Sequence, residues 1–414
     1  MRGLFQFMRP GLTVLALILV GCNPESSRDG LETSGFQQWD SAGVMVAVTD
    51  GAEALASLSW RLDSLPMLAL GADPDPDQQF YGIAGVQGLR DGGIMVVNGG
   101  TQELRFLDAE GRLVRSVGRK GEGPGEFLEP ALVRRVEGDS LLLWDIGLRR
   151  LQLFSPDGVD SRTVPLADWP WGAGALPPVG AVANRLLIRK TRPIGPDHIS
   201  GSGAKVDSVS FVWLDPGTGE TTLLFLRSLW FLFRTPSNPP VLSIIPFTVR
   251  PAGTVIENGA LITEGTNPEI RHYGPDGRLR QIDRIAGPNR PVTEEGLRAY
   301  VASQVAPEFI DQTLDLYHGM PIPAELPWFD ELKVDATGLV WAHIYEPDRS
   351  RPKVWVVFDK DGRALGTVST PSDLKVEWIG EDRILGVWLD ELGIEYVHEY
   401  GLVRTADRRG MGTG

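Results

Sequence analysis

The sequence predicts an all-β fold, a six-bladed β-propeller, from three observations. Glycine (49 residues) and proline (31) make up about a fifth of the 414 residues without a Gly-X-Y period, which favours a turn-rich β protein. Hydrophobic residues make up 42% and charged residues 23%, as in folded globular proteins. A unit of two short apolar runs between turn residues recurs six times along the chain.

The six repeated units have similar lengths. Each begins at a Gly, Asp or Asn and ends at a Gly, and these two markers are 18, 19, 35, 18, 24 and 19 residues apart. The units are residues 93–111, 139–158, 184–219, 259–277, 338–362 and 382–401. The third and fifth are longer because each contains a surface loop inside a hairpin. An apolar stretch precedes each unit and another usually follows it, so each predicts four antiparallel strands, the blade of a propeller.

A glycine-rich connector, 116–127 (SVGRKGEGPGEF), follows the first unit. It resembles the connector of NHL-type repeats, and the chain from about residue 60 is similar to the six-bladed, NHL-like propeller lipoproteins of bacteria. A phosphate-binding loop would continue into a Lys-Ser/Thr pair and a helix, and this run does neither. The glycines therefore predict a structural connector between blades.

The spacing of this connector also occurs near the N-terminus. Gly71 and Phe80 are 9 residues apart, as are Gly118 and Phe127. Residues 60–70 therefore take the place of an outer strand, although no blade precedes them in the sequence. We expect them to complete blade six, which closes the ring and leaves only short sheet edges.

One segment departs from the repeat and predicts a short helical insertion between blades four and five, at about residues 293–317. Apolar residues recur there at helical spacing, and Thr293 is a suitable N-cap. A single propeller domain is expected over residues 41–405, followed by a disordered tail at 406–414. The domain is expected to be a monomer.

The N-terminus predicts export. Two arginines precede an apolar stretch at 11–20, which is too short to span about 30 Å of hydrocarbon. The stretch ends in Leu-Val-Gly-Cys22, which resembles the bacterial lipobox, and Cys22 is the chain's only cysteine. The resemblance implies that residues 1–21 are a lipoprotein signal peptide and that Cys22 carries the lipid. The alternative is an ordinary signal peptide with a chance cysteine.

The segment after the cysteine indicates where the protein is anchored. Asn23 stands where an inner-membrane retention signal usually has Asp, so the outer membrane is favoured. Residues 22–40 are polar and predict a flexible tether. The membrane is therefore expected to be reached through the lipid anchor alone.

Six equivalent positions predict a polar ring at one mouth of the channel. Each stands four residues beyond the first apolar residue of a unit's leading strand: Asn98, Asp145, Lys190, Glu264, His343 and Trp388. Five of them are polar or charged, which buried strands do not favour. The alternative is that polar residues merely mark the strand ends, where solvent begins.

Two function classes follow. The first is a binding or scaffolding module that holds an envelope protein or glycan on one propeller face, without a cofactor. The second is a lactonase-like hydrolase or lyase with a divalent cation, such as calcium, held by Asp145, Glu264 and His343. Lys190 would then orient an anionic substrate. The binding role is preferred because no catalytic motif stands out. The net charge of −14 argues against nucleic acid.

Overall fold

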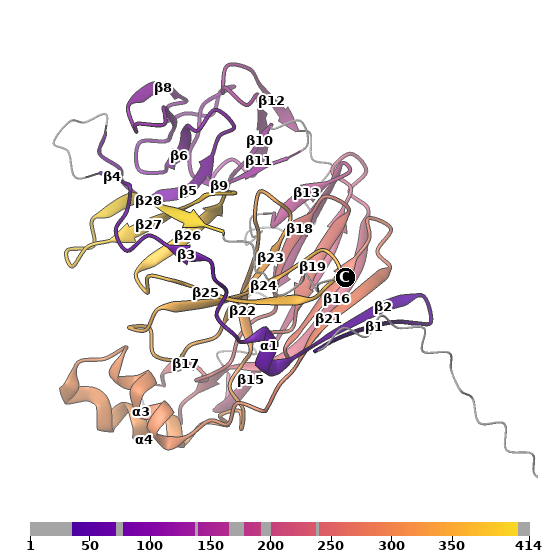
Figure 1. Cartoon of the computed structure of the whole chain (residues 1–414). Helices are drawn as coiled ribbons and strands as arrows, with labels where there is room; N and C mark the ends of the chain where they lie inside the picture. Colours follow the sequence, from indigo (N-terminus) through magenta and orange to yellow (C-terminus); the bar gives the residue numbers. More distant parts are fainter. Residues whose placement is uncertain are drawn as a thin grey trace, which may run out of the picture.

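The computed structural model describes residues 35–71, 78–136, 140–164, 178–191, 200–236 and 240–404. The predicted signal peptide, Cys22 and the C-terminal tail lie outside the described residues. The described strands form six sheets (Figure 1). No helix among these residues is long and apolar enough to span a membrane.

The first three sheets follow one another along the chain. The first contains β5 (Ile83–Gly88), β6 (Ile94–Asn98), β7 (Glu103–Leu107) and β8 (Leu113–Val117). The second contains β9 (Pro130–Arg135), β10 (Leu141–Asp145), β11 (Arg150–Phe154) and β12 (Ser161–Val164). The third contains β13 (Gly180–Val182), β14 (Arg185–Thr191), β15 (Gly203–Leu214), β16 (Thr221–Arg234) and β17 (Leu242–Ile244).

The other three sheets combine C-terminal strands with strands from the N-terminus. The fourth contains β18 (Ala252–Ile256), β19 (Gly259–Thr263), β20 (Glu269–Tyr273) and β21 (Leu279–Ala286), with β2 (Val44–Asp50) and β1 (Phe36–Ser41) at its edge. The fifth contains β22 (Phe329–Val334), β23 (Val340–Ile344), β24 (Lys353–Phe358) and β25 (Ala364–Thr370). The sixth contains β26 (Leu374–Ile379), β27 (Arg383–Leu389), β28 (Glu395–Val403), β3 (Arg61–Leu62) and β4 (Leu68–Leu70).

The second strand of a sheet is more deeply buried than its outer, fourth strand. Every residue of β6, β10 and β19, the second strands of their sheets, is buried. A strand covered on both faces needs apolar side chains on both, which explains the continuous apolar runs of the repeated units. The outer strand β8 instead alternates between half-buried and exposed residues, because one of its faces meets solvent.

The six sheets pack on one another in a closed series, the arrangement of a β-propeller. One apolar cluster lies between each sheet and the next. A further cluster joins the sixth sheet to the first, with Leu385 and Val397 packed against Ile83 and Ile94. The first strand of the sixth sheet also contacts that of the first. The core is therefore divided among the interfaces between sheets.

Residues 36–70, here called the N-terminal belt, run along the outer edges of three sheets (indigo in Figure 1). β2 pairs in parallel with β21, and Ser57 bridges to Thr367 of β25. β3 and β4 then pair with β28, which joins the two ends of the chain in one sheet as the repeated spacing predicts. β1 begins at Phe36, so part of the segment predicted as tether is a strand.

Helical residues lie between β21 and β22. The elements are α3 (Glu294–Ala302), a 3₁₀ turn η3 (Pro307–Phe309) and α4 (Ile310–His318), and a four-residue helix α1 (Gly51–Ala54) lies in the belt. The side chain of Thr293 caps α3 by accepting a hydrogen bond from the Gly296 amide at 3.0 Å. The apolar sides of α3 and α4 pack on Phe247, beyond β17, so the helices sit beside that strand (Figure 1).

Candidate functional site

The six side chains predicted as a polar ring occupy one end of the second strands. Asn98 and Asp145 are the last residues of β6 and β10, and Glu264 directly follows β19. The other three stand within two residues of the ends of β14, β23 and β27. What each side chain contacts decides which of them is free to meet a ligand.

Asn98 and Asp145 are fully buried and bind their own sheets. Oδ1 of Asn98 accepts a hydrogen bond from the Tyr81 amide at 2.8 Å, just before the first strand. Oδ2 of Asp145 accepts from the Leu128 amide at 2.9 Å, and its Oδ1 accepts from two further backbone amides. These contacts tie the end of the second strand to the segment that enters the first. Both residues therefore have structural partners for their side-chain oxygens.

Glu264 and Lys190 lie in different surroundings. Glu264 forms ion pairs with Arg227 of the third sheet and with Arg271, the latter at 3.1 Å. Lys190 is half-buried, and burial lowers the pKa of its ammonium group. The carboxylate of Glu264 is thus neutralised by arginines of two sheets.

Two of the predicted residues have a buried polar atom without a hydrogen-bond partner among the described residues, Asn98 at its Nδ2 and His343 at its Nε2. Nδ1 of His343 lies 2.5 Å from Oδ1 of Asp330 in β22, and the His343 ring is 5.1 Å from that of Trp355, centroid to centroid. Its Nε2 is buried and has no hydrogen-bond partner among the described residues. A buried polar atom without a partner is costly, so the environment of this nitrogen needs an explanation.

His343 lines a cavity of about 350 Å³ at one end of the fifth sheet. Tyr300 of α3 lines it as well, so the helical segment contributes to its wall. The other lining residues come from the ends of β22 and β23, the following loop, the start of β24 and the segment before β26: Asp330, Tyr345, Glu346, Pro347, Asp348, Arg349, Arg351, Lys353 and Ser372. We call this cavity the His343 pocket.

Lys353, which lines the pocket, links the fifth sheet to the sixth. Its ammonium group donates a hydrogen bond to the Leu374 carbonyl at 2.7 Å. Burial lowers the pKa of Lys353, and the carboxylates of Glu331 and Asp330 act against this shift. Burial also raises the pKa of Tyr345. The pocket therefore offers a desolvated cation and a neutral phenol beside the imidazole.

Trp388 lies close to this pocket in the sixth sheet. Its indole nitrogen donates to Asp373, the neighbour of the pocket-lining Ser372. Its ring stacks on His398, with centroids 5.0 Å apart and planes 10° apart. Of the six predicted positions, His343 and Trp388 thus border one region, whereas Asn98 and Asp145 are used within their own sheets.

The proposed metal ligands are not gathered. Among the described residues no group of three or more His, Cys, Asp or Glu side chains could hold a metal ion. Asp145 is occupied by backbone amides and Glu264 by arginines, so neither is free to join His343. The described residues therefore do not assemble the predicted calcium site from these three side chains.

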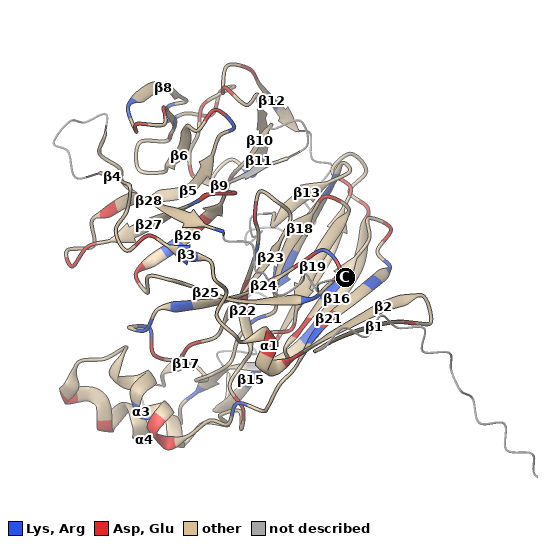
Figure 2. Cartoon of the chain, in the orientation of Figure 1, with Lys and Arg blue, Asp and Glu red and all other residues tan. Residues whose placement is uncertain are grey.

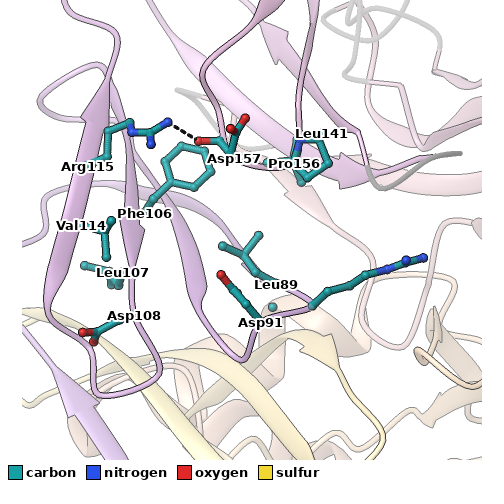
Figure 3. A pocket seen from close by; sticks show the side chains of 12 residues that line it. Leu89, Asp91, Phe106, Leu107, Asp108, Val114, Arg115, Leu141, Pro156 and Asp157 are labelled. Carbon is teal, nitrogen blue, oxygen red and sulfur yellow. Dashed lines mark hydrogen bonds between the residues drawn. The ribbon is translucent and has the colours of Figure 1, made fainter.

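Two apolar grooves lie at the other end of the strands. One, of about 380 Å³, lies between the first and second sheets, with Phe106, Leu107 and Leu141 in its lining (Figure 3). Arg115 at its rim donates to the Asp157 carbonyl at 2.7 Å. A similar groove, lined by Leu142, Leu186 and neighbouring residues, lies between the second and third sheets. Because equivalent grooves recur between successive sheets, we interpret them as a consequence of blade packing.

No family model and no curated protein matches this chain. Solved structures give a likeness of fold. A member of the DUF4221 family from Bacteroides vulgatus has a TM-score of 0.47 at 10% identity, covering 84% of this chain and 99% of that one. A protein from Bacteroides fragilis described as exported has a TM-score of 0.43 at 10% identity, covering 85% and 99%. The calcium-binding protein regucalcin from Agrobacterium tumefaciens has 0.37 at 13%, covering 84% and 97%. At such similarity no ligand or activity carries over.

The sequence did not lead us to the residues that line the pocket together with His343. Asp330 lies in the apolar stretch before the fifth unit, and Lys353 begins the second strand of that unit's hairpin. Neither occupies the repeated position that singled out the other residues. The excess of charged residues from Asp330 to Lys333, inside a first strand expected to be apolar, is the signal that could have located them.

Proposed function

We propose that this chain is an exported lipoprotein, anchored through Cys22 in the outer membrane, whose NHL-like repeats form one six-bladed propeller that binds an envelope glycan in the His343 pocket. The helical segment between the fourth and fifth blades is an insertion that walls this pocket. The motif at Cys22 and the closed series of sheets support the proposal. The observation that carries the binding role is the polar cavity itself, whose wall includes His343, a residue with a buried and unpartnered Nε2.

The lining of the pocket favours a glycan over a protein segment. Its volume, about 350 Å³, lies at the small end of ligand pockets, which suits one or two sugar rings better than an extended chain. Tyr300 and Tyr345 line the pocket, and a tyrosine side chain can pack against a sugar ring and form hydrogen bonds with its hydroxyls. His343 and Asp330 add polar atoms of the kind that fix a polyhydroxylated ligand. A glycan is therefore the ligand class that the lining matches best.

An array of bacterial envelope saccharides, probed with the purified full-length protein in detergent, tests the binding role. We expect a restricted set of saccharides to bind and His343→Gln to reduce their affinity about tenfold, the value of one lost hydrogen bond in a desolvated site. His272→Gln is the matched control, because His272 also pairs with a carboxylate, that of Asp283 at 2.5 Å, but does not line the pocket. Equal loss in both variants, or no binding by the parent protein, would contradict the proposal.

The anchor is tested separately from the pocket. Metabolic labelling with palmitate is expected to label the parent protein and to fail for Cys22→Ala, and globomycin is expected to block processing. Fractionation is expected to place the labelled protein in the outer membrane. Labelling that persists in Cys22→Ala, or a mature N-terminus at another residue, would rule out this anchor.

A metal-dependent hydrolase or lyase is the less favoured function, because the described residues provide no metal-binding group. Elemental analysis of the purified protein tests it directly. Stoichiometric calcium that is lost in Asp145→Asn and Glu264→Gln would replace the binding role with this alternative.

A further inference from the structure

Arg189 lies in β14 and faces the interface between the third and fourth sheets. Leu187, two residues earlier on the same face of the strand, is fully buried in the apolar cluster that joins these sheets. Arg189 is directly opposite Phe211 of β15, which belongs to the same cluster. The half-buried side chain of Arg189 therefore lies at the end of this interface. Lys190, the next residue, was predicted as a site residue and points to the opposite face of the strand.

Arg250 reaches the same interface from the segment that precedes β18, the first strand of the fourth sheet. It forms an ion pair with Asp207 at 2.8 Å, and its guanidinium lies 4.0 Å from the ring centroid of Phe231. Asp207 is 2% exposed and stands on the face of β15 that also carries Phe211. The one buried carboxylate on this face of β15 is thus already paired with Arg250.

Among the described residues, no carboxylate pairs with Arg189 in the same way. Within the described parts of the chain, Arg189 forms no hydrogen bond or ion pair. Burial and the positive charge of Arg250 both lower the pKa of Arg189. Holding a desolvated guanidinium beside a second one, without a counter-ion, is unfavourable unless an anion occupies the site.

The surrounding charges are also unbalanced. At the interface of the third and fourth sheets there are more arginines than carboxylates that pair with them. The whole protein, in contrast, has a net charge of −14. The arginines are Arg189, Arg227, Arg250, Arg271 and Arg284, and the carboxylates are Asp207, Glu264 and Glu269. Figure 2 shows basic residues on neighbouring strands of this region, including β16 and β21. The interface is therefore a basic region of an acidic protein.

We propose that Arg189 and Arg250 bind an oxyanion, a carboxylate or phosphate group of a ligand, at the end of the interface between the third and fourth sheets. The planar guanidinium of Arg189 presents a fork of N–H donors that matches two oxygens of such a group. Arg250, held by Asp207 and stacked on Phe231, supplies a second donor whose orientation is fixed. The site is separate from the His343 pocket and does not depend on glycan binding.

Thermal unfolding and calorimetric titration of the full chain in detergent, with sodium phosphate and sodium acetate as probes, test this site. Sodium chloride at equal ionic strength corrects for general screening. We expect phosphate, acetate or both to raise the melting temperature of the parent protein above the chloride value, and the more effective probe identifies the group. In Arg189→Gln the affinity for that probe is expected to fall at least about tenfold.

The stability of the variant without a probe separates a ligand site from a structural role. Removing an unpaired, desolvated cation should leave the melting temperature unchanged or raise it. Arg383→Gln is the matched control, because Arg383 is a half-buried arginine paired with Glu399 at 3.0 Å in the sixth sheet. The control should melt at a lower temperature and keep its response to the probe. The proposal fails if neither probe exceeds chloride, if Arg189→Gln keeps the response, or if it is destabilised as strongly as the control.

Discussion

The Nδ1 atom of His343 lies 2.5 Å from Oδ1 of Asp330, so that a carboxylate on the first strand of the fifth sheet orients an imidazole on the second. This contact fixes Nδ1 as the protonated nitrogen and leaves Nε2 as the unprotonated one. The same relation makes the pair testable, because changing Asp330 should alter the orientation of His343 without removing it.

Asp330→Asn should remove the preference of His343 for the tautomer protonated at Nδ1. The carboxylate is about one-third exposed, so the expected loss in the free energy of unfolding is small, about 1 kcal/mol. Nitrogen-15 spectra of histidine-labelled protein would report the tautomer, and urea unfolding the stability. Asp283→Asn should change only the signals of His272. An unchanged His343 spectrum in Asp330→Asn would contradict the assigned role.

Asp145→Asn should destabilise the protein without changing ligand binding. The fully buried carboxylate accepts hydrogen bonds from three backbone amides, those of Leu128, Glu129 and Leu148, and an amide side chain would turn a donor toward one of them. The expected loss is about 2 kcal/mol or more in urea unfolding. Asp160→Asn, at an exposed position of the same sheet, should stay within about 0.5 kcal/mol of the parent. If Asp145→Asn lowered the affinity for the glycan as well as the stability, Asp145 would have to be part of the binding site.

Protonation of Glu331 in acid should lower the free energy of unfolding. Burial alone would raise the pKa of Glu331, but the ammonium of Lys333 at 2.9 Å, with His343 and Lys353, holds it below the ordinary 4.5. The stability from this group is therefore fully present above pH 4.5 and is lost as the pH falls through the lower folded-state value. Unfolding free energies measured between about pH 6 and 3 should fall less steeply for Glu331→Gln than for the parent. An equally flattened curve for Glu391→Gln, in an exposed turn, would show that the effect is not specific.

Gly366→Ala should detach the N-terminal belt from the fifth sheet. Gly366 has a φ of +142°, and a Cβ there would lie 2.6 Å from the Ala56 carbonyl oxygen, which accepts a hydrogen bond from the Thr367 amide. We expect a loss of about 3 kcal/mol and faster proteolytic release of the belt. Gly393 also has a positive φ, +77°, but open space around it, so Gly393→Ala should lose only about 1 kcal/mol. Equal losses would show that backbone strain alone, and not belt contact, determines the effect.

Much of the propeller follows from local sequence patterns. Turn glycines such as Gly111, Gly277 and Gly362 have φ near +80°, which is why they recur at the ends of the repeated units. The apolar runs between these turns become strands that are buried on both faces. Both signals are local, so a single sequence reveals them. The pairing of residues 60–70 with β28 could also be predicted, because a repeated connector spacing left one strand without a sheet.

The contacts between distant segments could not be predicted in the same way. The apolar run at Val44–Val48 indicates a strand, but its parallel pairing with β21 depends on a free edge more than 200 residues away. Asp330 approaches His343 only because two adjacent strands pair with a bulge between Phe329 and Glu331. Periodicity does not specify such irregularities.

By itself, the sequence determined the repeated two-strand units, the turns between them, the strand that joins the chain ends, and six equivalent strand-end positions. Only the tertiary structure decided what those positions do. The carboxylate of Asp145 accepts hydrogen bonds from backbone amides of its own sheet, and that of Glu264 pairs with arginines of two sheets, whereas His343 lines a cavity. The physical reason is that turn chemistry and burial act within one unit, whereas the partner of a polar side chain is set by whichever strand, loop or helix packs beside it.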